Sequence, residues 1–429
     1  MQLKRFLGSC LALMSISFAS SAFAADKPVT IRFAHHDAES SPSTKPIYDA
    51  VADYAKKVAD KYTLIQETAP SDTLKSKIQI DMSSNNLPDI MWYWGAASDA
   101  SALVKSGMIL NVDDFFAQSG MSRNDFKDLW DGVTINGKNY CIPVDNLISS
   151  WVVNKSLFKE YGLEIPKTYD DVIKCAKVFN EHGIITLGFG SKGGNPSNWV
   201  VDMLYSQYPG YRDELLNIAK KKTIDTPNFR KAMGLFEQLI DAKAFPADMV
   251  ANGDWGPYWA LFTSGKAAIS WAWSGMIASL KDANFEWELI DQPQVVGTNH
   301  DTSKDLYAYS GAGIMINKKS FGDAKKKAAI IDFVKFYFSD AMQQTMLYSN
   351  GVIPTRKNVK YDETKLDPIV VKVMKYVDGR KPFLTHLSTI PVASVWVDYE
   401  NGLDDFFSKN KTAGQYIDYV QASLKKAKL

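Results

Sequence analysis

Residues 136–171 read NGKNYCIPVDNLISSWVVNKSLFKEYGLEIPKTYDD, and no other stretch says as much about the fold. The pair Asn136-Gly137 indicates a tight hairpin turn, because both central residues of a type I′ turn need a positive φ. The segment that follows, 140–153, is rich in β-forming residues and is broken by a proline and by Asp145. We expect this segment to form one long strand that passes between two parts of the molecule.

Two helices are predicted in the second half of the same stretch. After Asn154, a short helix should end at Gly162, because glycine adopts the left-handed conformation of a helix C-cap without strain. Thr168 is the expected N-cap of the next helix, and Asp171 stands three residues later, at the reciprocal position of a capping box. The stretch therefore predicts a strand, a short helix and a capped longer helix, in this order.

This order closely resembles the bacterial extracellular solute-binding proteins of the sugar-binding family 1, which are related to the maltose-binding proteins. Their pattern is roughly "inGK-Y-giP…yNk-lF-k-yGl-iPkTwdel", and in them the long strand is the first crossover between two lobes. The resemblance covers nearly the whole chain at further ordered points, which are 109–116, 262–275, 309–317 and 350–357.

The resemblance implies an α/β protein with the two-lobe periplasmic binding protein fold (type II-like), with a ligand cleft between lobes joined by hinge crossovers. The expected N-terminal lobe consists of residues 25–143 with 309–361, and the C-terminal lobe of residues 144–308 with 362–429. The implied function is that of a monomeric substrate-binding subunit of an ATP-binding cassette (ABC) importer. Such a subunit binds a mono- or oligosaccharide by lobe closure and delivers it to membrane permease subunits.

The residues by themselves also predict an α/β pattern near the N-terminus. Strands are expected at 29–34, 63–67 and 89–95, with helical patterns between them. The third of these strands is continuously apolar, as a parallel strand covered on both faces should be. Strands that alternate with helices indicate right-handed βαβ units.

The first residues have the three parts of a secretory signal peptide, expected to span 1–24. Lys4 and Arg5 are the basic part, 6–18 is the apolar part, and Ala-Phe-Ala at 22–24 is the cleavage motif. The apolar part is too short to cross a bilayer. We therefore expect a periplasmic protein.

Length and charge limit the classes of function. A chain of 429 residues is long enough for two domains, each able to bury a core of its own. Its 49 Lys and Arg residues are balanced by 48 Asp and Glu residues, which argues against nucleic acid as a partner, because nucleic-acid binding needs a basic face.

Neither a metal nor a cofactor is expected. Cys141 and Cys175 remain after removal of the signal, and the sequence leaves a disulfide between them open, since only the geometry decides it. His35-His36 has no further ligand at metal-binding spacing. Residues 188–193 match G-x-G-x-x-G formally, but Pro196 follows at once and the βαβ context is missing, so we interpret the segment as a cleft-lining loop.

Eleven tryptophans in a secreted chain favour a carbohydrate ligand. Sugars have flat C–H faces that pack on aromatic rings, and hydroxyl rims that planar polar side chains bind. Trp94 ends the third strand, where ligands of open α/β sheets lie. Core packing is the alternative for each tryptophan. The candidate ligand-binding residues, aromatic and polar, are His36, Asp37, Tyr93, Trp94, Asp145, Asn146, Trp151, Trp199, Trp273, Gly311 and Trp396.

Two other readings stay open at this point. A secreted glycoside hydrolase would also be rich in tryptophan, and it needs two carboxylates roughly 5–9 Å apart, which Asp37 and Asp145 could imitate. However, the chain has no G-x-S-x-G or H-E-x-x-H motif, and we expect no enzyme. The other reading keeps the fold and changes the ligand to a polyol, a glycerophosphoester or a cation.

Overall fold

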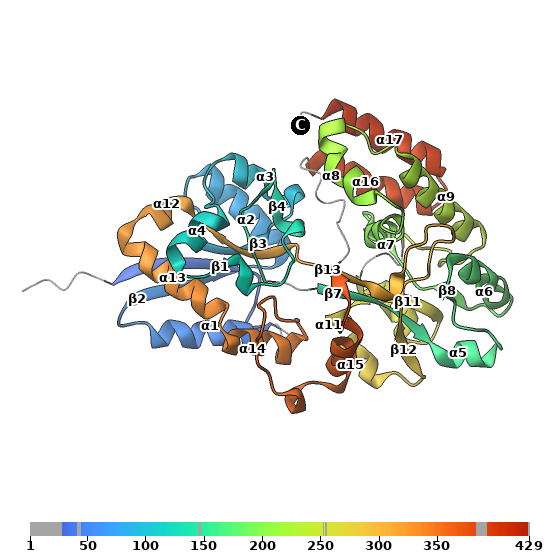
Figure 1. Ribbon diagram of the computed structural model, residues 1–429, viewed down its shortest axis with the longest axis horizontal. Helices are drawn as coiled ribbons and strands as arrows, with labels where there is room; N and C mark the ends of the chain where they lie inside the picture. The colour runs from blue at the N-terminus through green and yellow to red at the C-terminus, as the bar shows by residue number, and fades with distance from the viewer. Residues whose placement is uncertain are drawn as a thin grey trace, which may run out of the picture.

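The protein is described here from a computed structural model that covers residues 28–40, 44–144, 147–251, 253, 255–382 and 393–427. Two lobes lie side by side and are joined by chain segments that pass between them (Figure 1). The predicted signal peptide, Asp145 and Asn146 lie outside the described residues. Among the described residues, no helix has the length and apolar character needed to cross a bilayer.

The first lobe, called the N-lobe, is built on a five-stranded sheet of order β2-β1-β3-β14-β6. Strand β1 is parallel to β2 and β3, and β14 is antiparallel to β3 and β6. The predicted strands near the N-terminus are confirmed as β1, β2 and β3. The bounds are β1 (Val29–His35), β2 (Tyr62–Thr68), β3 (Ile90–Trp94), β6 (Ile142–Pro143) and β14 (Ala312–Ile316).

The second lobe, called the C-lobe, is built on a six-stranded sheet of order β15-β13-β7-β11-β8, in which β12 also pairs with β7. Its central strand β7 is antiparallel to β11, β12 and β13. The bounds are β7 (Leu147–Asn154), β8 (Ile185–Leu187), β11 (Ala267–Trp273), β12 (Trp287–Ile290), β13 (Asp305–Tyr309) and β15 (Lys381–Pro382).

Helices cover both sheets (Figure 1). The helices that pack around the N-lobe sheet are α1 (Lys45–Lys57), α2 (Ser71–Ser83), α3 (Ala97–Lys105), α4 (Val112–Ser119), α12 (Lys318–Gly322) and α13 (Ala324–Tyr337). Those of the C-lobe are α5 (Lys155–Glu160), α6 (Tyr169–Glu181), α7 (Ser197–Tyr205), α8 (Tyr211–Lys221), α9 (Pro227–Asp241), α10 (Trp255–Thr263), α11 (Ser274–Ile277), α16 (Ala393–Phe407) and α17 (Ala413–Lys426). Between the lobes, in the lower part of Figure 1, lie α14 (Asp340–Asn350) and α15 (Pro368–Val377).

The chain crosses between the two sheets where the sequence predicts it, but not as one continuous strand. Segment 140–153 contributes β6 to the N-lobe sheet and β7 to the C-lobe sheet. Pro143 lies in β6, which is an edge strand, and an edge strand tolerates the missing N–H of proline. A second crossing connects β13 in the C-lobe to β14 in the N-lobe.

Local signals in the opening stretch are confirmed. Asn136 and Gly137 have φ of 51° and 73°, and they join the short antiparallel strands β4 (Thr134–Ile135) and β5 (Lys138–Asn139). Gly162, with φ of 63°, follows α5. At the start of α6, the Thr168 hydroxyl accepts from the Asp171 N–H at 3.2 Å, and the Asp171 carboxylate accepts from the Thr168 N–H at 3.2 Å. This is the predicted capping box.

Each lobe has its own apolar core. The N-lobe core includes Phe33, Met91 and Phe333, and the C-lobe core includes Trp151, Phe229 and Tyr416. A third apolar cluster contains Ile148 from β7 together with Leu347 from α14 and Val370 from α15. This cluster ties the segments between the lobes to the C-lobe sheet. Cys141 and Cys175 are both buried and form no disulfide with each other, which resolves the question that the sequence left open.

Candidate functional site

An aromatic wall stands at the N-lobe edge from which the chain crosses to the C-lobe. Trp94, the last residue of β3, pairs with Ala312, the first residue of β14 after the second crossing. The adjoining Gly95 N–H donates to the carbonyl of Gly311 at 2.7 Å. The end of β3 is therefore held beside the crossover, at the carboxyl end of two parallel strands, where open α/β sheets bind ligands.

The wall itself consists of Trp92, Trp94 and His36. The ring centroids of Trp92 and Trp94 are 5.0 Å apart and their planes form an angle of 82°. His36 lies 3.9 Å from Trp92 and 6.4 Å from Trp94, centroid to centroid. The Lys75 ammonium stands 4.5 Å over the Trp94 ring. Burial lowers the pKa of His36, against the opposing effect of Asp37, so a neutral imidazole lies next to the two indoles.

Tyr93 has a different place from its two neighbours. Only 1% of Tyr93 is exposed, and it packs in the N-lobe core. Burial raises the pKa of its hydroxyl to about 12. Because side chains of a strand alternate between two faces, Trp92 and Trp94 share one face and Tyr93 occupies the other. We therefore leave Tyr93 out of the site and include Trp92, which is also buried but lies on the face of Trp94; the sequence prediction omitted it.

Asp37 belongs to a buried polar group behind the wall. Its carboxylate lies 3.3 Å from Nδ1 of His35, and Nε2 of His35 lies 3.0 Å from the Gln66 side-chain oxygen. Asp37 and His35 are both buried. This chain of contacts fixes the loop that carries His36. It gives Asp37 a positioning role in addition to the ligand contact that the sequence predicted.

A second aromatic wall stands on the C-lobe. Trp273, the last residue of β11, pairs with Ser149 near the start of β7, so it too lies beside a crossover. Its ring centroid is 4.9 Å from that of Trp199 on α7 and 4.9 Å from that of Trp271. Trp255 on α10 lies 5.9 Å from Trp271. Trp199 and Trp255 are partly exposed, whereas Trp271 is fully buried.

Trp151 lies behind this wall and not on it. It pairs with Trp271 across the β7–β11 ladder and is 1% exposed. The rings of Tyr169 and Phe189 pack nearly perpendicular to it, at centroid distances of 6.3 and 5.3 Å. Its ring therefore has no free face for a ligand, and we leave it out of the site. Gly311, predicted as a ligand-binding residue, has a structural contact here, because its carbonyl accepts the hydrogen bond from Gly95. Its contact with a ligand stays a prediction.

Helix α16 borders the C-lobe wall and carries Trp396 and Glu400. Trp396 is partly exposed and stacks on Tyr399, with centroids 5.2 Å apart and an angle of 23° between the planes. Asn198 on α7 donates its amide to a Glu400 oxygen at 3.1 Å. Burial raises the pKa of Glu400 to about 7, and the nearby Asp99 of the N-lobe adds to this effect, while Lys75 opposes it.

The glycine-rich loop that matches G-x-G-x-x-G packs on the same helix. The carboxylate of Asp404 accepts hydrogen bonds from the Gly193 N–H at 2.6 Å, the Gly194 N–H at 2.9 Å and the Ser191 hydroxyl at 2.7 Å. Gly194 has φ of 70°, and a Cβ on it would stand 2.4 Å from the Cα of Glu400. The chain's own carboxylate thus occupies the amides that a phosphate would need, which argues against a nucleotide site in this loop. Its place along the cleft stays a prediction.

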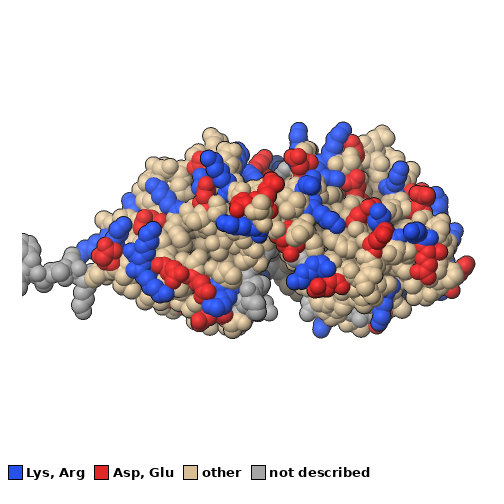
Figure 2. Space-filling view, turned by 90° about the horizontal axis from the view of Figure 1, so that it is seen from below, with Lys and Arg blue, Asp and Glu red and all other residues tan. Residues whose placement is uncertain are grey.

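The two lobes meet at one side of the walls. Helix α3 of the N-lobe contacts α16 of the C-lobe. Beside this contact, the Lys75 ammonium pairs with Asp99 at 2.6 Å. A second connection is the ion pair between Arg212 on α8 and Asp131, which precedes β4 in the N-lobe. Figure 2, a view from below, shows the two halves meeting along a notch.

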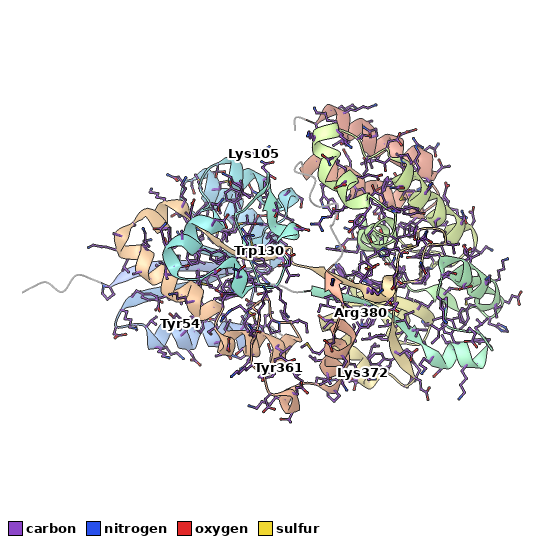
Figure 3. All side chains as sticks on the ribbon, viewed as in Figure 1. Tyr54, Lys105, Trp130, Tyr361, Lys372 and Arg380 are labelled. Carbon is purple, nitrogen blue, oxygen red and sulfur yellow. The ribbon has the colours of Figure 1, made fainter. Side chains whose placement is uncertain are left out.

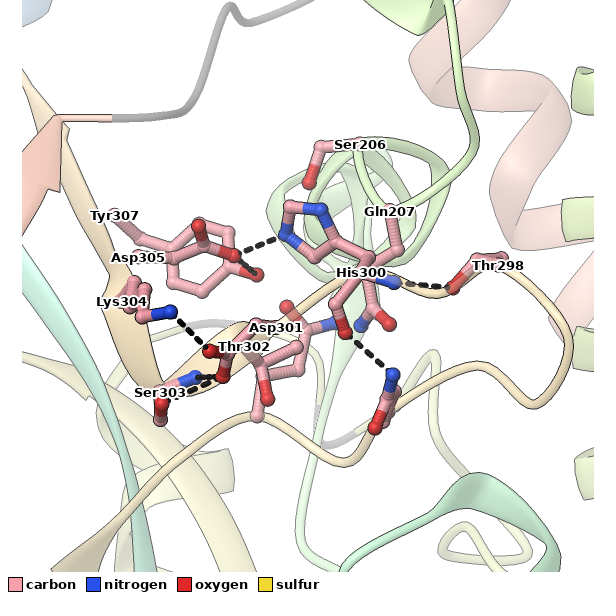
Figure 4. Close-up of polar contacts among 12 residues, drawn as sticks. Ser206, Gln207, Thr298, His300, Asp301, Thr302, Ser303, Lys304, Asp305 and Tyr307 are labelled. Carbon is pink, nitrogen blue, oxygen red and sulfur yellow. Dashed lines mark hydrogen bonds and ion pairs between the residues drawn. The ribbon is translucent and has the colours of Figure 1, made fainter.

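A polar network lies close to the second crossing, on the C-lobe side. Asp305, the first residue of β13, accepts from His300 and, at 3.4 Å, from the Tyr307 hydroxyl (Figure 4). Arg380, labelled in Figure 3, donates to the carbonyl of Asp305 at 3.2 Å. The network fixes the strand from which the chain leaves the C-lobe. None of the sequence predictions included it, because its members are spread over 300–380.

Two comparisons relate the sequence to known proteins. The profile of the family described as bacterial extracellular solute-binding protein matches residues 39–344. A protein of Brucella abortus that carries only a general binding-protein name is 26% identical over 250 residues, which are 56% of either chain. The fructooligosaccharide ABC transporter substrate-binding protein of Streptococcus pneumoniae is 25% identical over 294 residues, 59% of this chain and 49% of that protein. The chain thus spans about half the length of the curated relatives it matches.

A solved structure gives a longer match. A protein studied for xylan utilization by the thermophilic bacterium Caldanaerobius polysaccharolyticus superposes with a TM-score of 0.74 at 21% identity. The match covers 92% of this chain and 100% of that one. At this identity, the likeness is one of fold.

Proposed function

The chain belongs to the bacterial extracellular solute-binding protein family, and from this premise we propose that it is the periplasmic substrate-binding subunit of an ABC-type sugar importer. In this proposal the N-lobe and C-lobe, divided at the predicted boundaries of 25–143 with 309–361 and 144–308 with 362–429, close around a mono- or oligosaccharide. The closed form then delivers the sugar to the permease subunits. The protein works as a monomer and catalyses no reaction.

One observation carries the proposal: an aromatic wall stands on each lobe beside the crossovers. Trp92 and Trp94 belong to the N-lobe wall, and Trp199 and Trp273 to the C-lobe wall. Aromatic rings on both sides of a flat ring can pack on both of its faces when the lobes approach each other. The polar groups beside the walls, His36, Glu400 and their neighbours, supply hydrogen bonds for the rim of hydroxyls.

Lobe closure follows from the same arrangement. A ligand held by one wall only would not favour any lobe arrangement, whereas a ligand that touches both walls binds the closed form more tightly. The crossovers between β6 and β7 and between β13 and β14 are the segments that would change their backbone angles during closure. The relative from Streptococcus pneumoniae, a fructooligosaccharide-binding subunit, supports the sugar class.

A thermal-shift screen tests the proposal. The panel, called the sugar panel below, comprises monosaccharides, fructo-oligosaccharides, xylo-oligosaccharides and maltodextrins, with glycerol phosphodiesters and polyamines as other ligand classes. A sugar present at about 100 times its Kd should stabilise the protein by about 2.7 kcal/mol, an easily detected rise in Tm. A rise with a phosphodiester or polyamine alone would contradict the sugar class. Release of reducing ends from a bound oligosaccharide would contradict the binding role and favour a hydrolase.

A further inference from the structure

Glu400 occupies an unusual position at the meeting of the two lobes. It lies on α16, which contacts α3 of the other lobe, and its neighbour across this contact is another carboxylate, Asp99. Its remaining polar partner on its own lobe is the Asn198 amide at 3.1 Å. The meeting of the lobes therefore places two acidic side chains near each other, and Glu400 is only partly exposed there.

The charges around Glu400 come from every element packed against it. Asp99 on α3 and Asp404, one turn along α16, disfavour its ionised form, and Lys75 on α2 favours it. The Asp404 carboxylate itself accepts hydrogen bonds from three donors of the glycine-rich loop. Tyr399 and Tyr416 also interact electrostatically with Glu400, and both are buried hydroxyls.

Lys75 does not neutralise the pair of carboxylates fully. Its ammonium is 2.6 Å from Asp99 and also lies over the Trp94 ring, so it is committed to the N-lobe. When the lobes meet, one ammonium faces two carboxylates, and the contact is left with one excess negative charge. An open arrangement would take Asp99 away from this contact and expose Glu400 further, and a glutamic acid in water is ionised at neutral pH.

We propose that closure of the lobes takes up a proton on Glu400, so that mild acid favours the closed, ligand-binding arrangement. This inference rests on the proposed function, because it concerns the regulation of the same site. Glu400 thus acts as a positioning residue that links the lobes to the pH of the surroundings. The acid form can also donate a hydrogen bond, which an ionised carboxylate cannot do.

The sign of the effect follows from proton linkage. Burial against Asp99 raises the pKa of Glu400 where the lobes meet, so the closed form binds more protons than the open form between the ordinary pKa and the raised one. Affinity should therefore rise as the pH falls from about 8 to about 5.5. With a pKa of about 7 in the closed form, the gain in affinity is about 30-fold.

The main experiment is titration calorimetry at about pH 8 and about pH 5.5. It measures the affinity for the panel sugar that raises Tm most. In the wild type, binding should be tighter at the lower pH, with net proton uptake revealed by buffers of different ionisation enthalpy. Glu400→Gln, which keeps the shape and removes the titration, should bind with the same affinity at both pH values. Asp99→Asn should reduce the pH dependence. Glu181→Gln, an exposed glutamate of α6, is the matched control and should behave as the wild type.

A second measurement needs no ligand. Small-angle scattering of the free protein should give a smaller radius of gyration at the lower pH in the wild type and a constant radius in Glu400→Gln. If neither the sugar affinity nor the radius of gyration of the wild type changes with pH, the inference is overturned and the proposed function stays intact. If no sugar of the panel binds but the radius still depends on pH through Glu400, the proposed function fails and the inference stands. A pH dependence that persists in Glu400→Gln assigns it to another group and overturns the inference.

Discussion

A single position decides whether an aromatic ring at the end of β3 is available to a ligand. Trp94 is partly exposed beside the crossover, Trp92 supports it from the same face, and Tyr93 between them is buried in the core. The strand's alternation could have separated these three rings, but the run Ile90–Trp94 is aromatic or apolar throughout, so the sequence gives no contrast between the faces.

The residue-scale prediction concerns Trp94. Trp94→Ala should weaken binding of the best panel sugar about 10- to 150-fold, since burying a large apolar side chain contributes about 1.5–3 kcal/mol. The free energy of unfolding should fall less than for a fully buried tryptophan, because Trp94 packs against the N-lobe core but is only partly buried. The measurement is titration calorimetry with urea unfolding alongside. Trp287→Ala, on β12 and away from both walls, is the control and should leave the affinity unchanged; an equal loss in both variants would contradict the assigned role of Trp94.

At the scale of elements, the loop 191–198 and helix α16 form one unit. They are about two hundred residues apart in sequence, and Asp404 joins them by three hydrogen bonds from the loop. No local sequence pattern indicates a contact between residues so far apart. The sequence therefore predicted the loop and the helix but not the contact between them. The same separation explains why Glu400 was not among the predicted site residues, although Trp396 on the same helix was.

Removing the Asp404 carboxylate should destabilise this unit. Asp404→Ala leaves three donors without their acceptor, and we expect a loss of about 2–4 kcal/mol in the free energy of unfolding, since charge-assisted hydrogen bonds are worth more than neutral ones. Urea denaturation measures the loss. Asp405→Ala, the next residue, removes only a surface pair with Lys411 and should cost far less. Equal losses in the two variants would show that the loop does not depend on Asp404.

The crossover from β13 to β14 offers a second test at this scale. Gly313 lies in β14, and a Cβ on it would stand 2.0 Å from the carbonyl oxygen of Ile142 in β6. Gly313→Ala should therefore force the two strands apart and destabilise the protein by more than about 3 kcal/mol, as overpacking against rigid backbone does. Gly234→Ala, in the open middle of α9, meets nothing within 4 Å and should stabilise by up to about 1 kcal/mol. Thermal unfolding of both variants compares them directly, and a stable Gly313→Ala protein would contradict the close approach.

Features set by neighbouring residues could be predicted from the sequence, whereas features set by packing between distant elements could not. Turns and caps, such as Asn136-Gly137 and the box of Thr168 and Asp171, depend on neighbours in sequence and were predicted correctly. The two-lobe fold was implied by the resemblance to the solute-binding family, which rests on the order of such signals. The placement of Trp151 in the core could not be predicted, because it depends on Tyr169 and Phe189 packing against it from other elements.

At the scale of the whole molecule, the two lobes carry interspersed charges of both signs on the face seen in Figure 2. A large patch of like charge would act on the other lobe over a long distance. The face seen in Figure 2 has no such patch. Individual contacts join the lobes as well. One of them is the ion pair between Asp131 and Arg212, each 49% exposed in its side chain.

This ion pair should contribute to closure without contributing to folding. Asp131→Arg places two guanidinium groups opposite each other where the lobes meet, and it should weaken binding of the best panel sugar about two- to fivefold at low salt, an effect of the size that exposed ion pairs produce. The loss should shrink as salt is added, because exposed charges are screened. The charge swap Asp131→Arg with Arg212→Asp restores the attraction and should restore the affinity, while urea unfolding of all three proteins stays the same. A double variant that binds no better than Asp131→Arg alone would show that the two side chains do not meet when the ligand is bound.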